Sequence, residues 1–289
     1  MIRISTGLLF SIATLLTLAA CSVGHSVPED LLDPMLITGS HIEDLRRQTT
    51  LSPSALVTEL GKAELLVIGE DHVNTHHHAI EQWLLTRLPK TRPQGSVLME
   101  MIDVDQQSDV NAVKQGMRSG AYLRDERIQQ LLQWRTGWPW PLYRGVVLTA
   151  LAADYPLLAG NLSSEQTTMI YQTRQFPPGK HSARESVRAI LSAAIKQMHD
   201  GKMAPDQLRS MLAVQQHRDR FMASQLLNAP KPALLIAGGY HAAKNLGVPL
   251  HLADIHGQTA PVVLILAVKG MQVSAAEADY VWYVPANDP

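Results

Sequence analysis

Five short apolar runs, separated by segments of helical periodicity, constrain the fold of this chain more than any other feature. The runs are ELLVIG (64–69), SVLMEM (96–101), PLLAGN (156–161), PALLIAGG (232–239) and APVVLILAV (260–268). Continuous apolar runs of this length are typical of strands that are buried on both faces of a parallel sheet. Because helical segments connect them, the pattern predicts an α/β fold, with a mainly parallel sheet flanked by helices.

One long segment departs from this alternation. From residue 163 to residue 227 the periodicity is helical, interrupted by FPPGKH (176–181). We therefore expect a smaller helical insertion domain at 163–227, placed within an α/β domain that residues 41–162 and 228–289 form together.

Residues 1–20 are typical of a bacterial lipoprotein signal peptide. Arg3 precedes an apolar run that is too short for a transmembrane helix, which takes about 20 apolar residues, and small residues stand directly before Cys21. We expect cleavage before Cys21, lipidation of its thiol and a tether at residues 21–40. Ser22, in place of Asp, resembles the outer-membrane sorting signal. The sequence therefore predicts a lipid-anchored outer-membrane protein, on the periplasmic face or at the cell surface.

Composition excludes several classes of function. Cys21 is the only cysteine, so its lipidation leaves no thiol for disulfides, thiolate catalysis or cysteine-based zinc sites. The net charge is −1 and no basic stripe stands out, which argues against a nucleic-acid partner. A hydrophobic content of 46% in 289 residues is enough for a large core without disulfides.

Two of the predicted strands end in the same Gly-x-x-His pattern, at Gly69–His72 and Gly238–His241. Ligand sites in open parallel sheets form beyond the carboxyl ends of the strands, so these ends are expected to meet. Glu100 lies between two methionines near the end of a third strand, where a carboxylate is costly unless it is paired or coordinated. The predicted site therefore comprises Glu70, His72, Glu100 and His241. Such a set can hold a divalent metal ion with an open position, or divide general acid and base roles without one.

The triplet His76–His78 begins a predicted helix beside this site. Consecutive helical residues point about 100° apart, so the three side chains cannot all face one place. We expect His77 to point inward as a further metal ligand, and His76 and His78 to be solvated. On the later helix at 214–227, Arg218 is expected either to hold an anionic group in the site or to pair with Glu100 or Glu70.

Six segments resemble, in order and spacing, the ChaN family of haem-binding lipoproteins. They are VIGEDHVNTHHHAIEQWLL, VLMEMIDVDQQ, WPWPLYRG, LLAGNLSSEQ, AVQQHRDRFMA and AGGYHAAKNLGVP, and the resemblance covers roughly residues 40–255. This family is similar to the Tiki proteases, TraB and erythromycin esterase, with which it shares a superfamily. The pattern departs from the family in two places, where GGYH stands for the usual GNGH and YRG for the usual YRP.

The resemblance implies haem as the cofactor, a haem-linked homodimer and a tyrosine ligand to the iron. Tyr171 is the expected ligand, with His181 as a propionate or second-subunit contact; Tyr143 and Tyr240 are the alternatives. The implied function is the capture or relay of haem for iron uptake, by a binding protein and not an enzyme. The alternative is a hydrolase, with or without a metal ion, that uses Glu70, His72, Glu100 and His241 as catalytic residues.

Overall fold

The structure is a computed structural model that describes residues 39–120, 122–257 and 260–286. The predicted signal peptide, the lipidation site Cys21 and all but the last two residues of the predicted tether lie outside these ranges. Among the described residues, no helix combines the length and the apolar character that crossing a membrane requires.

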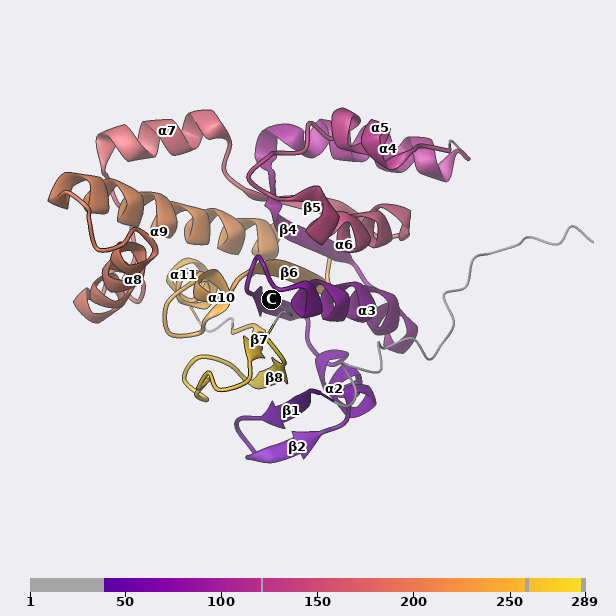
Figure 1. Cartoon of the computed structure of the whole chain (residues 1–289), viewed down its shortest axis with the longest axis horizontal. Helices are drawn as coiled ribbons and strands as arrows, with labels where there is room; N and C mark the ends of the chain where they lie inside the picture. Colours follow the sequence, from indigo (N-terminus) through magenta and orange to yellow (C-terminus); the bar gives the residue numbers. More distant parts are fainter. Residues whose placement is uncertain (1–38, 121, 258–259, 287–289) are drawn as a thin grey trace, which may run out of the picture. The chain divides into compact units, whose positions relative to one another are not determined.

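One sheet of eight strands runs through the described part of the chain (Figure 1). Its order is β2 (Thr49–Leu51), β1 (His41–Asp44), β8 (Tyr280–Val284), β7 (Val262–Val268), β3 (Leu65–Glu70), β6 (Ala233–Gly238), β4 (Ser96–Asp103) and β5 (Leu157–Asn161). The six strands from β8 to β5 are parallel, and β1 pairs antiparallel with both β8 and β2. The predicted fold class is confirmed, and each of the five predicted strands is present.

Every residue of β3, β4 and β6 is buried, because helices cover both faces of the sheet. One face carries α2 (Pro53–Leu60), α3 (Thr75–Thr91), α4 (Gln107–Arg118), α5 (Asp125–Leu131) and α6 (Trp140–Ala152). Alternate strand residues such as Leu66, Ile68 and Ile236 pack against these helices. The intervening residues, among them Val67 and Leu235, face the opposite helical layer.

That second layer consists of α9 (Pro205–Asn228), α10 (Gly239–Ala242) and α11 (Val248–His256). Figure 1 shows α10 and α11 on one side of the sheet and α3 and α6 on the other. Only the C-terminal part of α9 packs on the sheet, through residues such as Met222 and Leu226. Its N-terminal part, through Leu212, joins α8 (Glu185–Met198) in a separate small core.

The predicted insertion thus contains α7 (Ser164–Thr173), α8 and most of α9, and no strand lies among its residues, all of which are described. All described residues belong to one compact unit. The division into an α/β domain and an insertion at 163–227 stays a prediction. No residue of α7 is buried, so this helix leaves much of its surface to solvent.

Candidate functional site

The four residues expected at the strand ends meet in one buried network. Nδ1 of His72 lies 2.9 Å from Oε1 of Glu70, and its Nε2 lies 3.9 Å from Oε2 of Glu100. Nε2 of His241 lies 3.3 Å from Oε1 of Glu100. These contacts follow from strand order, since β6 lies between β3 and β4 and all three run parallel.

The glycines of the two Gly-x-x-His segments make this close approach feasible. A Cβ atom at Gly238 would lie 2.6 Å from Nε2 of His72, and one at Gly69 would lie 2.7 Å from the Cβ of Ala242. Neither position has room for a side chain. The backbone N–H of Gly238 also donates a hydrogen bond to Oε2 of Glu100, at 2.8 Å.

Two residues of α9 complete the network around His241, and the sequence analysis did not include either. Asp219 accepts a hydrogen bond from Nδ1 of His241 at 2.6 Å, and the amide of Gln215 lies 3.1 Å from the same nitrogen. Gln215 and Asp219 are four residues apart, so both project from one face of the helix. The i, i+4 spacing of Gln215 and Asp219 in the sequence VQQHRD is the signal that could have indicated their shared role. Arg218, the residue predicted to reach the site, lies on a neighbouring face of the helix.

His241 is consequently held between two carboxylates. Burial opposes its protonation, but Glu100 and Asp219 outweigh burial and raise the pKa of His241 to about 10. Burial also opposes ionisation of Glu100, yet the charge of His241 holds the pKa of Glu100 far below its ordinary value. At neutral pH the geometry therefore favours an imidazolium between two carboxylate anions.

Glu70 is the centre of the other half of the network. The Tyr143 hydroxyl, on α6, donates a hydrogen bond to Oε1 of Glu70 at 2.9 Å and lies 3.1 Å from Nδ1 of His72. Burial disfavours the charge on Glu70, but its contacts with His72 and His78 hold its pKa at about 2. For Tyr143, burial and the charge of Glu70 raise the pKa far above its ordinary value. Tyr143 is fully buried, so it cannot offer a phenolate to an external ligand.

The histidine triplet is arranged differently from the expectation. His77 does point inward, but its Nδ1 accepts a hydrogen bond from the backbone N–H of Asp71 at 2.9 Å, and burial lowers its pKa to about 4. The expectation that His78 is solvated was wrong: His78 is 4% exposed and its Nε2 lies 2.8 Å from Oε2 of Glu70. The reason is that α3 packs against both the sheet and α6, which buries more than one stripe of the helix.

α3 begins where it does because Asn74 caps it. The Asn74 side chain accepts hydrogen bonds from the backbone N–H groups of His76 and His77, at 2.9 and 3.3 Å. The cap fixes which residues of the first turns face Glu70. One of them is Glu81, a fully buried residue that the sequence analysis did not single out, and burial raises the pKa of Glu81 well above its ordinary value.

Arg218 is half-buried on α9. No hydrogen bond or ion pair joins it to Glu70 or Glu100 within the described part of the chain. Its charge acts on the carboxyl of Asp103, at the end of β4. The expected pairing of Arg218 with Glu100 or Glu70 is therefore absent among the described residues. The expected contact of Arg218 with an anionic group stays a prediction.

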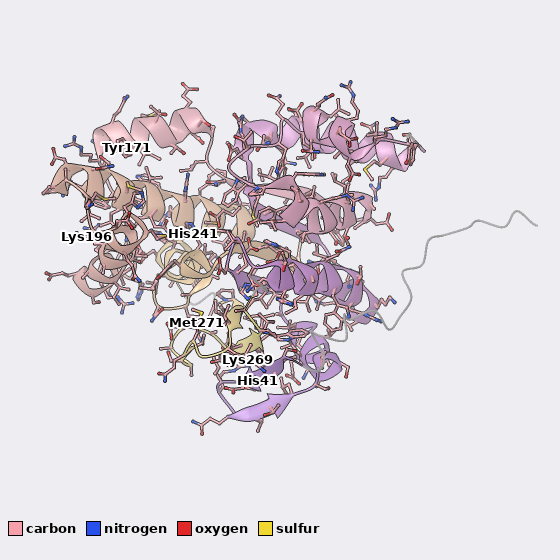
Figure 2. All side chains as sticks on the ribbon, in the orientation of Figure 1. His41, Tyr171, Lys196, His241, Lys269 and Met271 are labelled. Carbon is pink, nitrogen blue, oxygen red and sulfur yellow. The ribbon has the colours of Figure 1, made fainter. Side chains whose placement is uncertain are left out.

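Tyr171, the expected ligand of the haem iron, lies away from the buried network. Tyr171 is 40% exposed on α7, and Figure 2 shows it well apart from His241. His181 is exposed in the segment between α7 and α8, where its backbone N–H donates to Oδ1 of Asp254 at 2.7 Å. Tyr240 is 45% exposed. The structure therefore separates Tyr171 from the strand-end network, whereas Tyr240 directly precedes His241 of that network.

Solvent reaches the network at His72. Its side chain is 35% exposed, against 0% for Glu70, 2% for Glu100 and 7% for His241. The ring of Trp138, from the segment before α6, packs edge-on against His72 with centroids 4.9 Å apart. His72 is thus the group that could exchange a proton with a bound molecule, with the buried residues behind it setting its charge.

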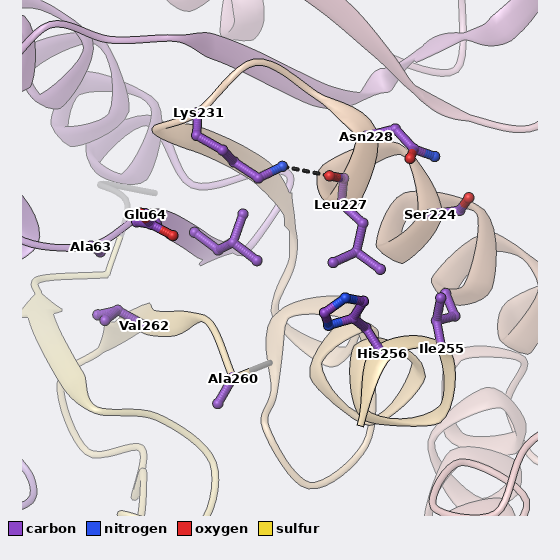
Figure 3. A pocket seen from close by; sticks show the side chains of 11 residues that line it. Ala63, Glu64, Ser224, Leu227, Asn228, Lys231, Ile255, His256, Ala260 and Val262 are labelled. Atoms are coloured by element: carbon purple, nitrogen blue, oxygen red, sulfur yellow. Dashed lines mark hydrogen bonds between the residues drawn. The ribbon is translucent and has the colours of Figure 1, made fainter. Parts of the chain in front are cut away.

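A cavity lies elsewhere, where strands β3 and β7 begin (Figure 3). It has a volume of about 710 Å³ and is lined by residues that include Glu64, Asn228 and Lys231. The Lys231 ammonium donates hydrogen bonds to the carbonyls of Leu226, Leu227 and Ala229, which terminates α9. This lysine therefore has a structural role, and the cavity contains none of the strand-end residues.

The fold and the network define a class of protein: an α/β protein whose parallel strands end in a buried set of paired glutamates and histidines. A family model described as "Haem-binding uptake, Tiki superfamily, ChaN" matches residues 56–252. The chain belongs to this family, and the resemblance found in the sequence is confirmed.

Solved structures extend the comparison. ChaN of Campylobacter jejuni, in a structure that describes cofacial haem binding, is 25% identical to this chain in sequence. The two structures align with a TM-score of 0.78 over 85% of this chain and 96% of that chain. An erythromycin esterase mutant in its open conformation is 12% identical, with a TM-score of 0.47 over 86% of this chain and 84% of that one. The type III effector HopBA1 is 11% identical, with a TM-score of 0.41 over 81% and 93%. No curated protein matches the chain.

The network predicts a specific dependence of stability on pH. Because the folded-state pKa of His241, about 10, exceeds its ordinary value of 6.5, its stabilising contribution is complete below pH 6.5 and is lost as the pH rises toward 10. Asp219→Asn removes one of the two carboxylates, so we expect it to lower the pKa of His241 by about 1–3 units. Histidine side-chain NMR titration and denaturant unfolding between pH 6 and 10 measure both effects. Titration of His241 near 6.5 in the unmodified chain would contradict the paired imidazolium.

Proposed function

We propose that this protein binds haem and serves haem uptake. The observation that supports the proposal is the family match across residues 56–252. The fold is also that of Campylobacter jejuni ChaN, for which cofacial haem binding is described.

The residues of α7 fit a haem site. Without a free cysteine, the side chains that can ligate haem iron are Tyr, His and Met. Tyr171 is 40% exposed, and Met169 on the same helix is 56% exposed. A tyrosinate is a hard anionic donor that suits ferric iron, and an exposed apolar side chain can contact the porphyrin face. Tyr171 is therefore the proposed ligand, with His181 as the proposed propionate or second-subunit contact.

We propose that the same helix takes part in a haem-linked homodimer. α7 has no buried residue, so much of its surface can be covered in an assembly. A haem bound at Tyr171 would leave its outer face exposed, and a second copy of the chain with its own haem would cover that face. We propose that haem drives this dimerisation.

Tyr171→Phe should weaken haemin binding by at least ~10-fold, because even groups that merely orient a metal ligand contribute that much. Haemin titration monitored by absorbance measures the affinity and the loss of the phenolate-to-iron band, and light scattering measures the dimer. Tyr240→Phe is the matched control, since Tyr240 is exposed to a similar extent, 45% against 40%. Loss of haemin binding in Tyr240→Phe but not in Tyr171→Phe would reassign the ligand.

We further propose that lipidation of Cys21 anchors the protein in the outer membrane. Cys21→Ala removes the thiol that accepts the lipid, so this variant should be recovered in the soluble fraction, whereas the unmodified chain should fractionate with membranes. Mass spectrometry should show the acyl chains on Cys21. Ser22→Asp is the control, because it keeps the lipid but alters the residue expected to direct sorting. A Cys21→Ala chain that still fractionated with membranes would contradict the anchor.

The strand-end network favours a second candidate function, hydrolysis. The observation in its favour is the continuous contact from Asp219 through His241 and Glu100 to His72, with only His72 open to solvent. Glu70 and Glu100 raise the pKa of His72 above its ordinary value, although burial opposes this. His72 can then take a proton from a water molecule or give one to a leaving group, while the buried carboxylates stabilise its charged form.

If the network is catalytic, His72→Ala and Glu100→Gln should each lower the hydrolysis rate by about 10²–10⁴-fold, the usual contribution of general acid–base catalysis. A screen of ester, amide and phosphoester substrates, followed by kcat and KM for any that react, measures this. His199→Ala is the control, because His199 is a remote histidine at the end of α8. Equal activity in all three variants would show that a reaction so found does not use the network.

A further inference from the structure

A second cluster of potential ligands lies behind the strand-end network, between the sheet and α3. Glu70 at the end of β3 meets His78 and Glu81 of α3, and one ligand atom from each residue lies within 4.8 Å of the others. His78 and Glu81 are three residues apart, so they share a face of the helix. All three side chains are buried, with exposed fractions of 4%, 4% and 0%.

The cluster lacks partners that would balance its buried polar atoms. Both carboxylate oxygens of Glu81, Oε2 of Glu70 and Nε2 of His78 have no hydrogen-bond partner among the described residues. Burying a carboxylate without a hydrogen bond or a counter-charge is strongly unfavourable. Glu81 is fully buried within the cluster, so either a proton or a metal ion is needed between these atoms.

The shortest contact in the cluster has the spacing of two metal ligands. Nε2 of His78 lies 2.8 Å from Oε2 of Glu70, yet the two atoms are not aligned as a hydrogen bond. Two ligand atoms that are each about 2.1 Å from an ion lie about 3 Å apart in an octahedral site and about 3.4 Å apart in a tetrahedral one. The distance therefore suits an ion that both atoms share.

Glu70 is oriented by groups that do not belong to the cluster. Its Oε1 atom accepts a hydrogen bond from the Tyr143 hydroxyl at 2.9 Å and lies 2.9 Å from Nδ1 of His72. These contacts leave Oε2 directed toward α3. Outer groups that fix a ligating carboxylate in this way are a regular feature of protein metal sites.

We propose that Glu70, His78 and Glu81 bind a divalent first-row transition-metal ion, which links the end of β3 to α3. Two carboxylates neutralise the charge of such an ion. One imidazole nitrogen and two carboxylate oxygens suit Zn²⁺, Fe²⁺ or Mn²⁺, whereas Ca²⁺ takes six to eight oxygen ligands. The set differs from the one predicted from sequence, because it replaces His72, His77, Glu100 and His241 with two residues of α3. The proposed metal site is a function beyond haem binding, and it does not depend on haem binding.

The test measures metal content and affinity in the haem-free full chain, prepared in detergent with an affinity tag that contains no histidine. Zn²⁺ titration with elemental analysis should give one ion for each chain. Glu81→Gln and His78→Gln should each weaken Zn²⁺ binding by at least ~10-fold, since they remove direct ligands. Co²⁺ is the second probe, because its visible absorption bands report the ligands and should change in both variants.

Two matched controls locate the ion. Glu100→Gln removes a glutamate that is buried as deeply but belongs to the strand-end network, and His77→Gln removes the buried neighbour of His78. Both controls should keep the ion and the Co²⁺ spectrum. Circular dichroism checks that each variant is folded. If His78→Gln does not fold, the isosteric variant Glu81→Gln alone tests the proposal.

Two outcomes would overturn the proposal. Loss of the ion in Glu100→Gln with retention in Glu81→Gln would place the metal at the strand-end network. Absence of tight Zn²⁺ and Co²⁺ binding in the unmodified chain would mean that a proton, and not a metal ion, occupies the space between Glu70 and Glu81. Neither outcome bears on haemin binding at Tyr171, which is measured separately.

Discussion

The structure depends on the pairing of charges buried under the ends of its parallel strands. Moving an ion out of water costs several kcal/mol even after the protein relaxes, so Glu100 is tolerable in β4 only because His241 and the Gly238 N–H face it. His241 in turn needs Asp219, which lies on α9. The charge requirement therefore dictates how α9 docks: a displacement that separated Asp219 from His241 would leave a buried charge unpaired. The buried contacts from Asp219 through His241 to Glu100 therefore fix the position of α9 relative to the strands more specifically than apolar packing does. Apolar contacts would allow the helix to shift along the sheet.

The same requirement explains the crowding of polar side chains around α3. Glu70 ends a strand whose residues are all buried, and it accepts contacts from His72, Tyr143 and His78, which come from a loop, from α6 and from α3. Three separate segments converge on one carboxylate. The aromatic rings of Trp138 and Tyr143 pack against the imidazoles of His72 and His78, which limits the access of water and strengthens each of these interactions. The WPWP segment is therefore a wall of the site as well as the start of a helix.

The sequence predicted the part of the site that the parallel strands bring together. A Gly-x-x-His at the end of two buried runs, with a glutamate at the end of a third, is enough to bring Glu70, His72, Glu100 and His241 together, because parallel neighbours end at the same edge. It did not predict β1, β2 or β8; β1 and β2 are short and polar, and β2 lies at the edge of the sheet. Nor did it predict Asp219, His78 or Glu81. Their roles depend on the rotation of α3 and α9 about their axes, which the Asn74 cap and packing between helices decide, and a helical periodicity gives only an approximate facing. His77 shows the limit: it was rightly placed inward, yet its nitrogen is used by the Asp71 backbone.

Tyr171 lies apart from the strand-end network, which raises the question of what the charges of this network do. A haem ligand on α7 would need neither the imidazolium at His241 nor the glutamates that flank it, since Tyr171 lies apart from them. A buried ion pair is also weak evidence of a stabilising role, because apolar side chains of similar volume often stabilise a core as well or better. A chain selected only for exposed haem binding could therefore have replaced these charges with apolar residues at little cost. One imidazole open to solvent and a buried carboxylate without a hydrogen-bond partner fit the two uses proposed for these charges, which are proton transfer at His72 and the binding of an ion at α3. Glu70 belongs to both sets of residues.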